Sequence, residues 1–148
     1  MASSGAPRRL EPSSPHGVYV WRGGRWAAAG RGELDGDGLY FIYFSNSECG
    51  ACRVFDEVWY PFVEMVSGRS AARFLVVLCG WFTRDCSSED AKSLFKEFDV
   101  HVSPTVVVLK RSNGRVEKLL KYEGLTSALT LTFAYANVLA GAREAQPG

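Results

Sequence analysis

The sequence contains no long hydrophobic run. No segment approaches the about 18 uninterrupted apolar residues that a membrane-spanning helix needs. Near the N-terminus, Arg8 and Arg9 are followed by Leu10-Glu11-Pro12 and not by the apolar core of a signal peptide. We therefore expect a soluble cytoplasmic protein with no membrane partner, a flexible leader over residues 1–16 and a loose tail over residues 141–148.

The chain also has little net charge. Its 17 Lys and Arg residues nearly balance its 16 Asp and Glu residues, which leaves a formal charge of +1. Such a chain has no bulk electrostatic attraction to nucleic acid, so nucleic acid is not expected as a partner. Apolar residues make up 47% of the 148 positions, which is typical of one globular domain. We place this domain at residues 17–140.

Cysteine is scarce as well, with four residues in the chain. Disulfide scaffolds are typical of small secreted domains, whereas cytoplasmic cysteines are more often catalytic or metal-binding. Intracellular proteins of hyperthermophiles are an exception, because they can be rich in disulfides. Cys49 and Cys52 form a Cys-x-x-Cys motif, and Cys79 and Cys86 follow at a wider spacing.

Apolar runs and helical patterns alternate along the domain. Helices are expected from Cys52 onward, after the N-cap signal Ser87-Ser88, and over Ser127–Leu139, and Pro61 should kink or end the first of them. A βαβ unit followed by a hairpin predicts an α/β fold with a mixed central sheet flanked by helices. The expected strands are a short hairpin from Gly17, then Leu39–Phe44, Phe74–Cys79, Thr105–Leu109 and Val116–Tyr122.

The segment Cys49-Gly50-Ala51-Cys52 stands between a buried strand and a helix. The start of a helix presents free amide groups and a partial positive charge, which stabilise a thiolate and lower its pKa. Cys49, nearer the loop, should be exposed and act as the nucleophile. Cys52, inside the first turn, should be more buried and resolve the mixed disulfide. Gly50 should allow another chain to approach closely.

A second feature is the stretch Ser103-Pro104-Thr105, where a proline opens an apolar strand. Because proline cannot donate a hydrogen bond to a sheet, it indicates an edge, a bulge or a special turn. Together with the Cys49–Cys52 motif after a buried strand and Gly124 after the hairpin, this stretch resembles the thioredoxin family. The resemblance covers about residues 39–139.

The resemblance implies a thioredoxin-like fold and a thiol–disulfide oxidoreductase. Cys49 and Cys52 would exchange electrons with protein disulfides, most simply as a reductant in cell redox homeostasis, and would need no cofactor beyond their own disulfide. The bond before Pro104 would be cis, and Gly50, Ala51, Ser103 and Pro104 would bind substrate. A thioredoxin-reductase-type protein would donate the electrons.

The sequence differs from the usual thioredoxin pattern at four places, which marks it as a divergent relative. Glu48 replaces the Trp before the first cysteine, and Ala51 replaces the Pro before the second. Tyr43 stands where a buried acid is usual, and Ser103 where Ile is usual. Glu48 places a negative charge beside Cys49, which opposes thiolate formation, whereas the helix terminus favours it.

Other interpretations of the cysteines remain open at this point. Cys49 and Cys52 could supply half of a zinc site, although zinc sites commonly use two paired motifs. The domain could also be a binding or adaptor module with structural or regulatory cysteines, since a fold does not dictate function. Cys79 and Cys86 could be buried thiols, a second redox pair, or a disulfide that would suit a protein from a thermophile.

Overall fold

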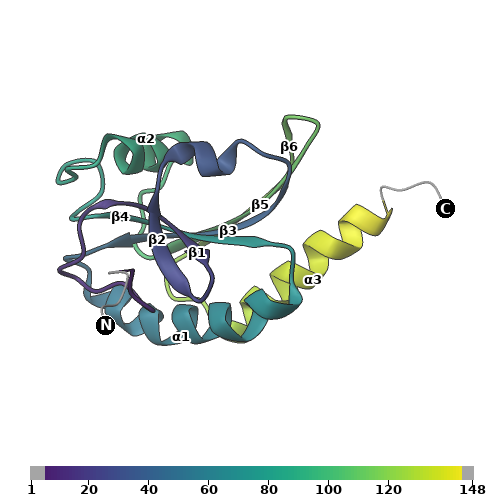
Figure 1. Cartoon of the computed structure of the whole chain (residues 1–148), viewed down its shortest axis with the longest axis horizontal. Helices are drawn as coiled ribbons and strands as arrows, with labels where there is room; N and C mark the ends of the chain where they lie inside the picture. The colour runs from purple at the N-terminus through teal and green to yellow at the C-terminus, as the bar shows by residue number, and fades with distance from the viewer. Residues whose placement is uncertain (1–5, 145–148) are drawn as a thin grey trace.

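The computed structural model describes residues 6–144, which form one six-stranded sheet with three α-helices (Figure 1). The strands are β1 (Gly17–Arg22), β2 (Arg25–Ala29), β3 (Gly38–Asn46), β4 (Arg73–Cys79), β5 (Thr105–Ser112) and β6 (Arg115–Glu123). The helices are α1 (Gly50–Val66), α2 (Glu89–Glu97) and α3 (Ala128–Glu144), with short 3-10 turns at Arg31–Leu34 and Ser67–Arg69.

The sheet is mixed and has the strand order β2-β1-β4-β3-β5-β6. Strands β3 and β4 are parallel and are joined through α1, whereas the other neighbouring strands are antiparallel. Asn113 and Gly114 both have positive φ angles and form the hairpin turn between β5 and β6. The prediction of an α/β fold with a mixed central sheet flanked by helices is confirmed.

Each face of the sheet has its own core, because successive side chains of a strand point to opposite sides. On β3, Phe41 and Tyr43 face α1 and α3, whereas Ile42 and Phe44 face α2. Figure 1 shows the same layers, with α1 and α3 below the sheet and α2 above it. The central strands are buried on both faces, which explains why they are continuous apolar runs.

Helix α1 differs from its prediction, since it runs unbroken through Pro61 to Val66. The helix was expected to kink or end at this proline. Trp59, Phe62 and Val63 on either side of it are buried in the same core. Packing of this apolar face outweighs the one backbone hydrogen bond that proline removes.

The expected leader also differs from its prediction over the residues that are described. Leu10 is buried, and the Pro7 carbonyl accepts a hydrogen bond from Trp26 N at 2.7 Å. Arg9 lies over the Tyr60 ring and forms an ion pair with Glu57 at 2.9 Å. Residues 6–16 therefore pack on the domain and are not a free leader, because they cover apolar surface of α1 and β2.

The C-terminal boundary of the domain also differs from its prediction. Helix α3 continues to Glu144, so residues 141–144 belong to it and not to a loose tail. Residues 1–5 of the expected leader and 145–148 of the expected tail lie outside the described residues. Within residues 6–144, no helix has the length and hydrophobicity required to span a membrane.

Candidate functional site

The Cys-x-x-Cys motif lies at the first turn of α1, just beyond the end of β3. Cys49 is the N-cap residue of the helix, and its Sγ accepts a hydrogen bond from Cys52 N at 3.0 Å. This bond places the Cys49 sulfur against the free amide groups at the start of the helix. Both thiols are free, which leaves the pair in its dithiol form.

The two cysteines differ in solvent exposure, but by less than their positions in the motif predict. Cys52 is fully buried, as expected for the inner residue, whereas Cys49 keeps only 6% of its surface exposed. The prediction that Cys49 is exposed is therefore wrong, because its Sγ turns toward the Ser103 carbonyl at 3.7 Å. Gly50 beside it is exposed, and a Cβ added there would meet no atom within 4 Å. Another chain can approach Cys49 across this open position.

The distant Ser103-Pro104 pair packs directly against the cysteines. The peptide bond between Ser103 and Pro104 is cis, the conformation that the resemblance implies. Ser103 Oγ lies 2.9 Å from Cys52 Sγ. The motif and the proline turn, predicted separately from sequence, thus form one site at the same edge of the sheet.

Asn46, the last residue of β3, orients the Ser103 hydroxyl. Its Oδ1 accepts a hydrogen bond from Phe82 N at 2.7 Å, and a backbone amide can only donate. The other end of the side chain, Nδ2, therefore donates to Ser103 Oγ at 3.0 Å. The hydroxyl hydrogen of Ser103 stays available for Cys52 Sγ, so Ser103 can donate to this sulfur when it is ionised.

This bond acts against the effect of burial on Cys52. Burial raises the pKa of the Cys52 thiol to about 11, whereas the Ser103 hydroxyl lowers it by stabilising the thiolate. At neutral pH Cys52 is therefore a thiol, and Asn46 and Ser103 are positioning residues that ease its ionisation. Sequence reasoning missed Asn46, because it lies beyond the apolar run and belongs to β3 only through its pairing with Cys79 of β4.

Replacing Ser103 with alanine is expected to raise the pKa of Cys52 by about one to two units, because a hydrogen bond to a charged group contributes about 1.5–3 kcal/mol. The NMR shift of Cys52 Cβ against pH, in a Cys49→Ser background, measures this change. Ser103→Thr keeps the hydroxyl and should leave the pKa near that of the background. An unchanged value in Ser103→Ala would show that Ser103 does not donate to the thiolate.

A buried acid lies beneath the motif, although it does not come from β3. Asp56 stands one helical turn after Cys52 and accepts a hydrogen bond from the Tyr43 hydroxyl at 2.8 Å. Arg53 forms an ion pair with Asp56 at 3.0 Å. Burial raises the pKa of Asp56, even though Tyr43 and Arg53 oppose that change. Sequence reasoning missed this acid, whose signal was an Asp four residues after a buried cysteine.

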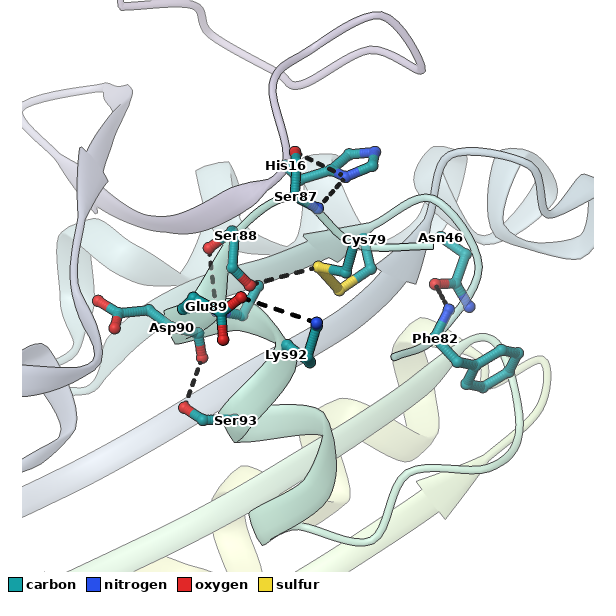
Figure 2. Close-up of a disulfide and its surroundings, with 12 residues drawn as sticks. His16, Asn46, Cys79, Phe82, Ser87, Ser88, Glu89, Asp90, Lys92 and Ser93 are labelled. Atoms are coloured by element: carbon teal, nitrogen blue, oxygen red, sulfur yellow. Dashed lines mark hydrogen bonds and ion pairs between the residues drawn. A yellow bond between two sulfur atoms is a disulfide. The ribbon is translucent and has the colours of Figure 1, made fainter. Parts of the chain in front are cut away.

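Cys79 and Cys86 form a disulfide, which is one of the three arrangements considered for them (Figure 2). The bridge closes the loop that follows β4. This loop meets the motif, since Glu48 N donates to the Gly80 carbonyl at 3.2 Å. Figure 2 shows Phe82 of the loop bonded to Asn46 on one side of the disulfide, with His16 accepting from Ser87 on the other.

The chain matches known proteins in structure but not in sequence. No protein-family model matches the chain, and no curated protein matches it in sequence. The thioredoxin of Aeropyrum pernix aligns with 86% of this chain and 98% of its own, at a TM-score of 0.59 and 17% identity. Mitochondrial thioredoxin 3 of Saccharomyces cerevisiae, in its oxidised form, aligns with 72% of this chain and 85% of its own, at 0.52 and 20%. The chain has the thioredoxin fold.

The thioredoxin fold explains how the separate motifs come together. Parallel pairing of β3 with β4 and antiparallel pairing of β3 with β5 bring the end of β3, the end of β4 and the start of β5 to one edge. Cys49, the disulfide loop and Pro104 are attached at these three ends. The sequence resemblance to thioredoxins is confirmed as a likeness of fold, whereas the roles of the individual site residues stay predictions.

The cysteine arrangement also bears on the zinc alternative. Cys79 and Cys86 are bonded to each other, so their sulfurs are not available as thiolate ligands beside Cys49 and Cys52. Over residues 6–144, the structure contains no group of three or more His, Cys, Asp or Glu side chains placed to hold a metal ion. The chemistry that this site supports directly is that of its two free thiols.

Proposed function

We propose that this thioredoxin-fold protein is a thiol–disulfide oxidoreductase that acts on protein disulfides, as a reductant. One observation carries the proposal: two free thiols begin a helix against a cis proline, with the Ser103 hydroxyl 2.9 Å from Cys52 Sγ and able to donate to its thiolate. A structural disulfide or a metal site does not require a hydrogen-bond donor aimed at the inner sulfur. A thiol that must ionise during a reaction does.

The reaction has two steps at these sulfurs. The Cys49 thiolate attacks one sulfur of the substrate disulfide, forms a mixed disulfide and releases the first substrate thiolate. Cys52 then attacks the Cys49 sulfur, closes the Cys49–Cys52 disulfide and releases the second substrate sulfur, with the Cys52 proton passing to a leaving thiolate. The protein loses two electrons and the substrate gains them.

The roles of the surrounding residues follow from this scheme. Gly50 and Ala51 border the open approach to Cys49, and the backbone at Ser103 and Pro104 is the surface on which a substrate chain would lie. A dithiol protein of the thioredoxin-reductase type would restore the reduced pair. The cytoplasm, where thiols are kept reduced, is the compartment that suits this cycle.

An insulin-type disulfide reduction assay tests the proposal. The wild-type protein is expected to accelerate reduction, and Cys49→Ser is expected to lower the rate to the uncatalysed background, because a serine hydroxyl is a far poorer nucleophile than a thiolate. Arg115→Ala, in the β5–β6 hairpin at the opposite end of the sheet from both thiols, is the control and should retain activity. Equal turnover by wild type and Cys49→Ser would contradict the enzyme and favour a binding module.

A further inference from the structure

A groove of about 530 Å³ lies beside the proposed redox site. One wall is the disulfide loop from Trp81 to Arg84, and the other is formed by the end of α2 and the segment that leads to Val102. The first wall is tied to the site through the Phe82–Asn46 hydrogen bond. The second wall ends at His101, two residues before Ser103. A substrate chain bound at Ser103 would therefore extend directly into this groove.

The groove presents aromatic side chains. Trp81 is 40% exposed, and its ring meets the Phe82 ring edge-on at 5.0 Å. Phe82 in turn packs against Phe95 of α2 at 5.9 Å. Phe82 has a φ angle of 57°, a conformation that bulky side chains rarely adopt, and its ring points away from the disulfide in Figure 2. The closed loop thus exposes Trp81 at the groove, while Phe82 both lines the groove and packs against the α2 side of the core.

The rim of the groove carries excess positive charge. Arg84 on the loop and Lys96 on α2 are both exposed. Within residues 6–144, neither has a carboxylate at ion-pair distance. The one acid of the lining, Asp99, is already bonded to His101. Two cations beside an aromatic surface are complementary to an acidic segment that contains an aromatic or aliphatic residue.

We infer that this groove selects substrates: it binds an acidic segment with an apolar anchor, next to the cysteine that Cys49 attacks in a substrate protein. The inference rests on the proposed function. Glu48, exposed beside Cys49, repels acids immediately next to the reacting sulfur. The acidic residues should therefore lie about two to four residues from the substrate cysteine, the distance that an extended chain needs to reach from Ser103 into the groove.

The test uses the reduced full-length protein and synthetic peptides, each with one cysteine in a mixed disulfide with 2-mercaptoethanol. Two pairs of matched peptides are used, one with the variable positions before the cysteine and one with them after it. Within each pair both peptides carry a tryptophan, and one has two Glu where the other has two Lys. We expect the second-order rate constant of peptide reduction to be about tenfold higher for the acidic peptide of the better-placed pair, with the preference shrinking as salt is added. In Arg84→Glu/Lys96→Glu, the preference should disappear or reverse. Trp81→Ala should lower the rate constant for the acidic tryptophan peptide, and should change it less when alanine replaces the tryptophan of that peptide.

Two controls separate this inference from the function on which it rests. Arg115→Glu/Lys118→Glu makes the same charge change at the opposite end of the sheet and should keep the preference. Bis(2-hydroxyethyl) disulfide is uncharged, and all the variants should reduce it at the wild-type rate. If this compound is reduced but acidic and basic peptides react equally, or if both double variants lose the preference equally, the groove is not the selector. If the wild type does not reduce it at all, the proposed function itself fails.

Discussion

Cys52→Ser is expected to accumulate stable mixed disulfides with substrate proteins on Cys49. The first step needs only the Cys49 sulfur, which keeps its place at the start of α1 and its approach over Gly50. The second step needs the buried Cys52 sulfur, which serine cannot replace as a nucleophile. With native insulin in excess, nearly all of the Cys52→Ser protein should form a covalent adduct, whereas the wild type should show almost none.

Non-reducing electrophoresis and intact-mass measurement detect this adduct directly. The matched control is Cys49→Ser/Cys52→Ser, which should form no adduct because Cys79 and Cys86 are already bonded to each other. Peptide mapping should place the new bond on Cys49. Adducts on Cys52 in Cys49→Ser that form as fast as those on Cys49 in Cys52→Ser would contradict the assigned roles.

Cys79→Ala/Cys86→Ala is expected to lower the free energy of unfolding by about 2–3 kcal/mol. The bridge spans a sequence separation of 7 residues, so it restricts a short loop of the unfolded chain. Cys79 is also fully buried at the end of β4, and alanine leaves its volume partly unfilled. Urea denaturation followed by circular dichroism measures the change as a lower midpoint at an unchanged slope.

The wild type in strong reductant provides the comparison for this variant. Where the reductant opens the bridge, the wild-type midpoint should fall toward that of the double variant, and the double variant itself should not respond. Ser87→Ala, next to the bridge but outside it, is a control that should shift the midpoint far less. A double variant as stable as the wild type would show that the bridge does not contribute to stability.

Most of the fold could be predicted because it depends on local patterns. Strands β3, β4 and β5 are apolar runs, and Asn113-Gly114 marks the hairpin between β5 and β6. The ends of elements were harder to predict. Strand β3 continues through Ser45 and Asn46, which were expected in a loop, because their backbones pair with Leu78 and Cys79 of β4. Such pairing depends on a neighbouring strand that the local sequence does not contain.

In the candidate site, too, the local features could be predicted and the contacts between distant segments could not. Cys49 and Cys52 are close in sequence, so their place at a helix start and the buried position of Cys52 were predictable. The burial of Cys49 was not, because its Sγ faces Ser103, 54 residues away. Asp56 was missed for a related reason: only the packing of α1 on β3 places its carboxylate against the Tyr43 hydroxyl.

By itself, then, the sequence determined the order of the elements, the thiol pair at a helix start and the proline that opens β5. These depend on residue type, periodicity and spacing within single segments. Only the tertiary structure decided that Asn46 orients Ser103 toward Cys52, that the Cys79–Cys86 loop reaches the site, and that residues 6–16 pack on the domain. These contacts join segments far apart in the chain, and their geometry depends on which strands pair and in which register.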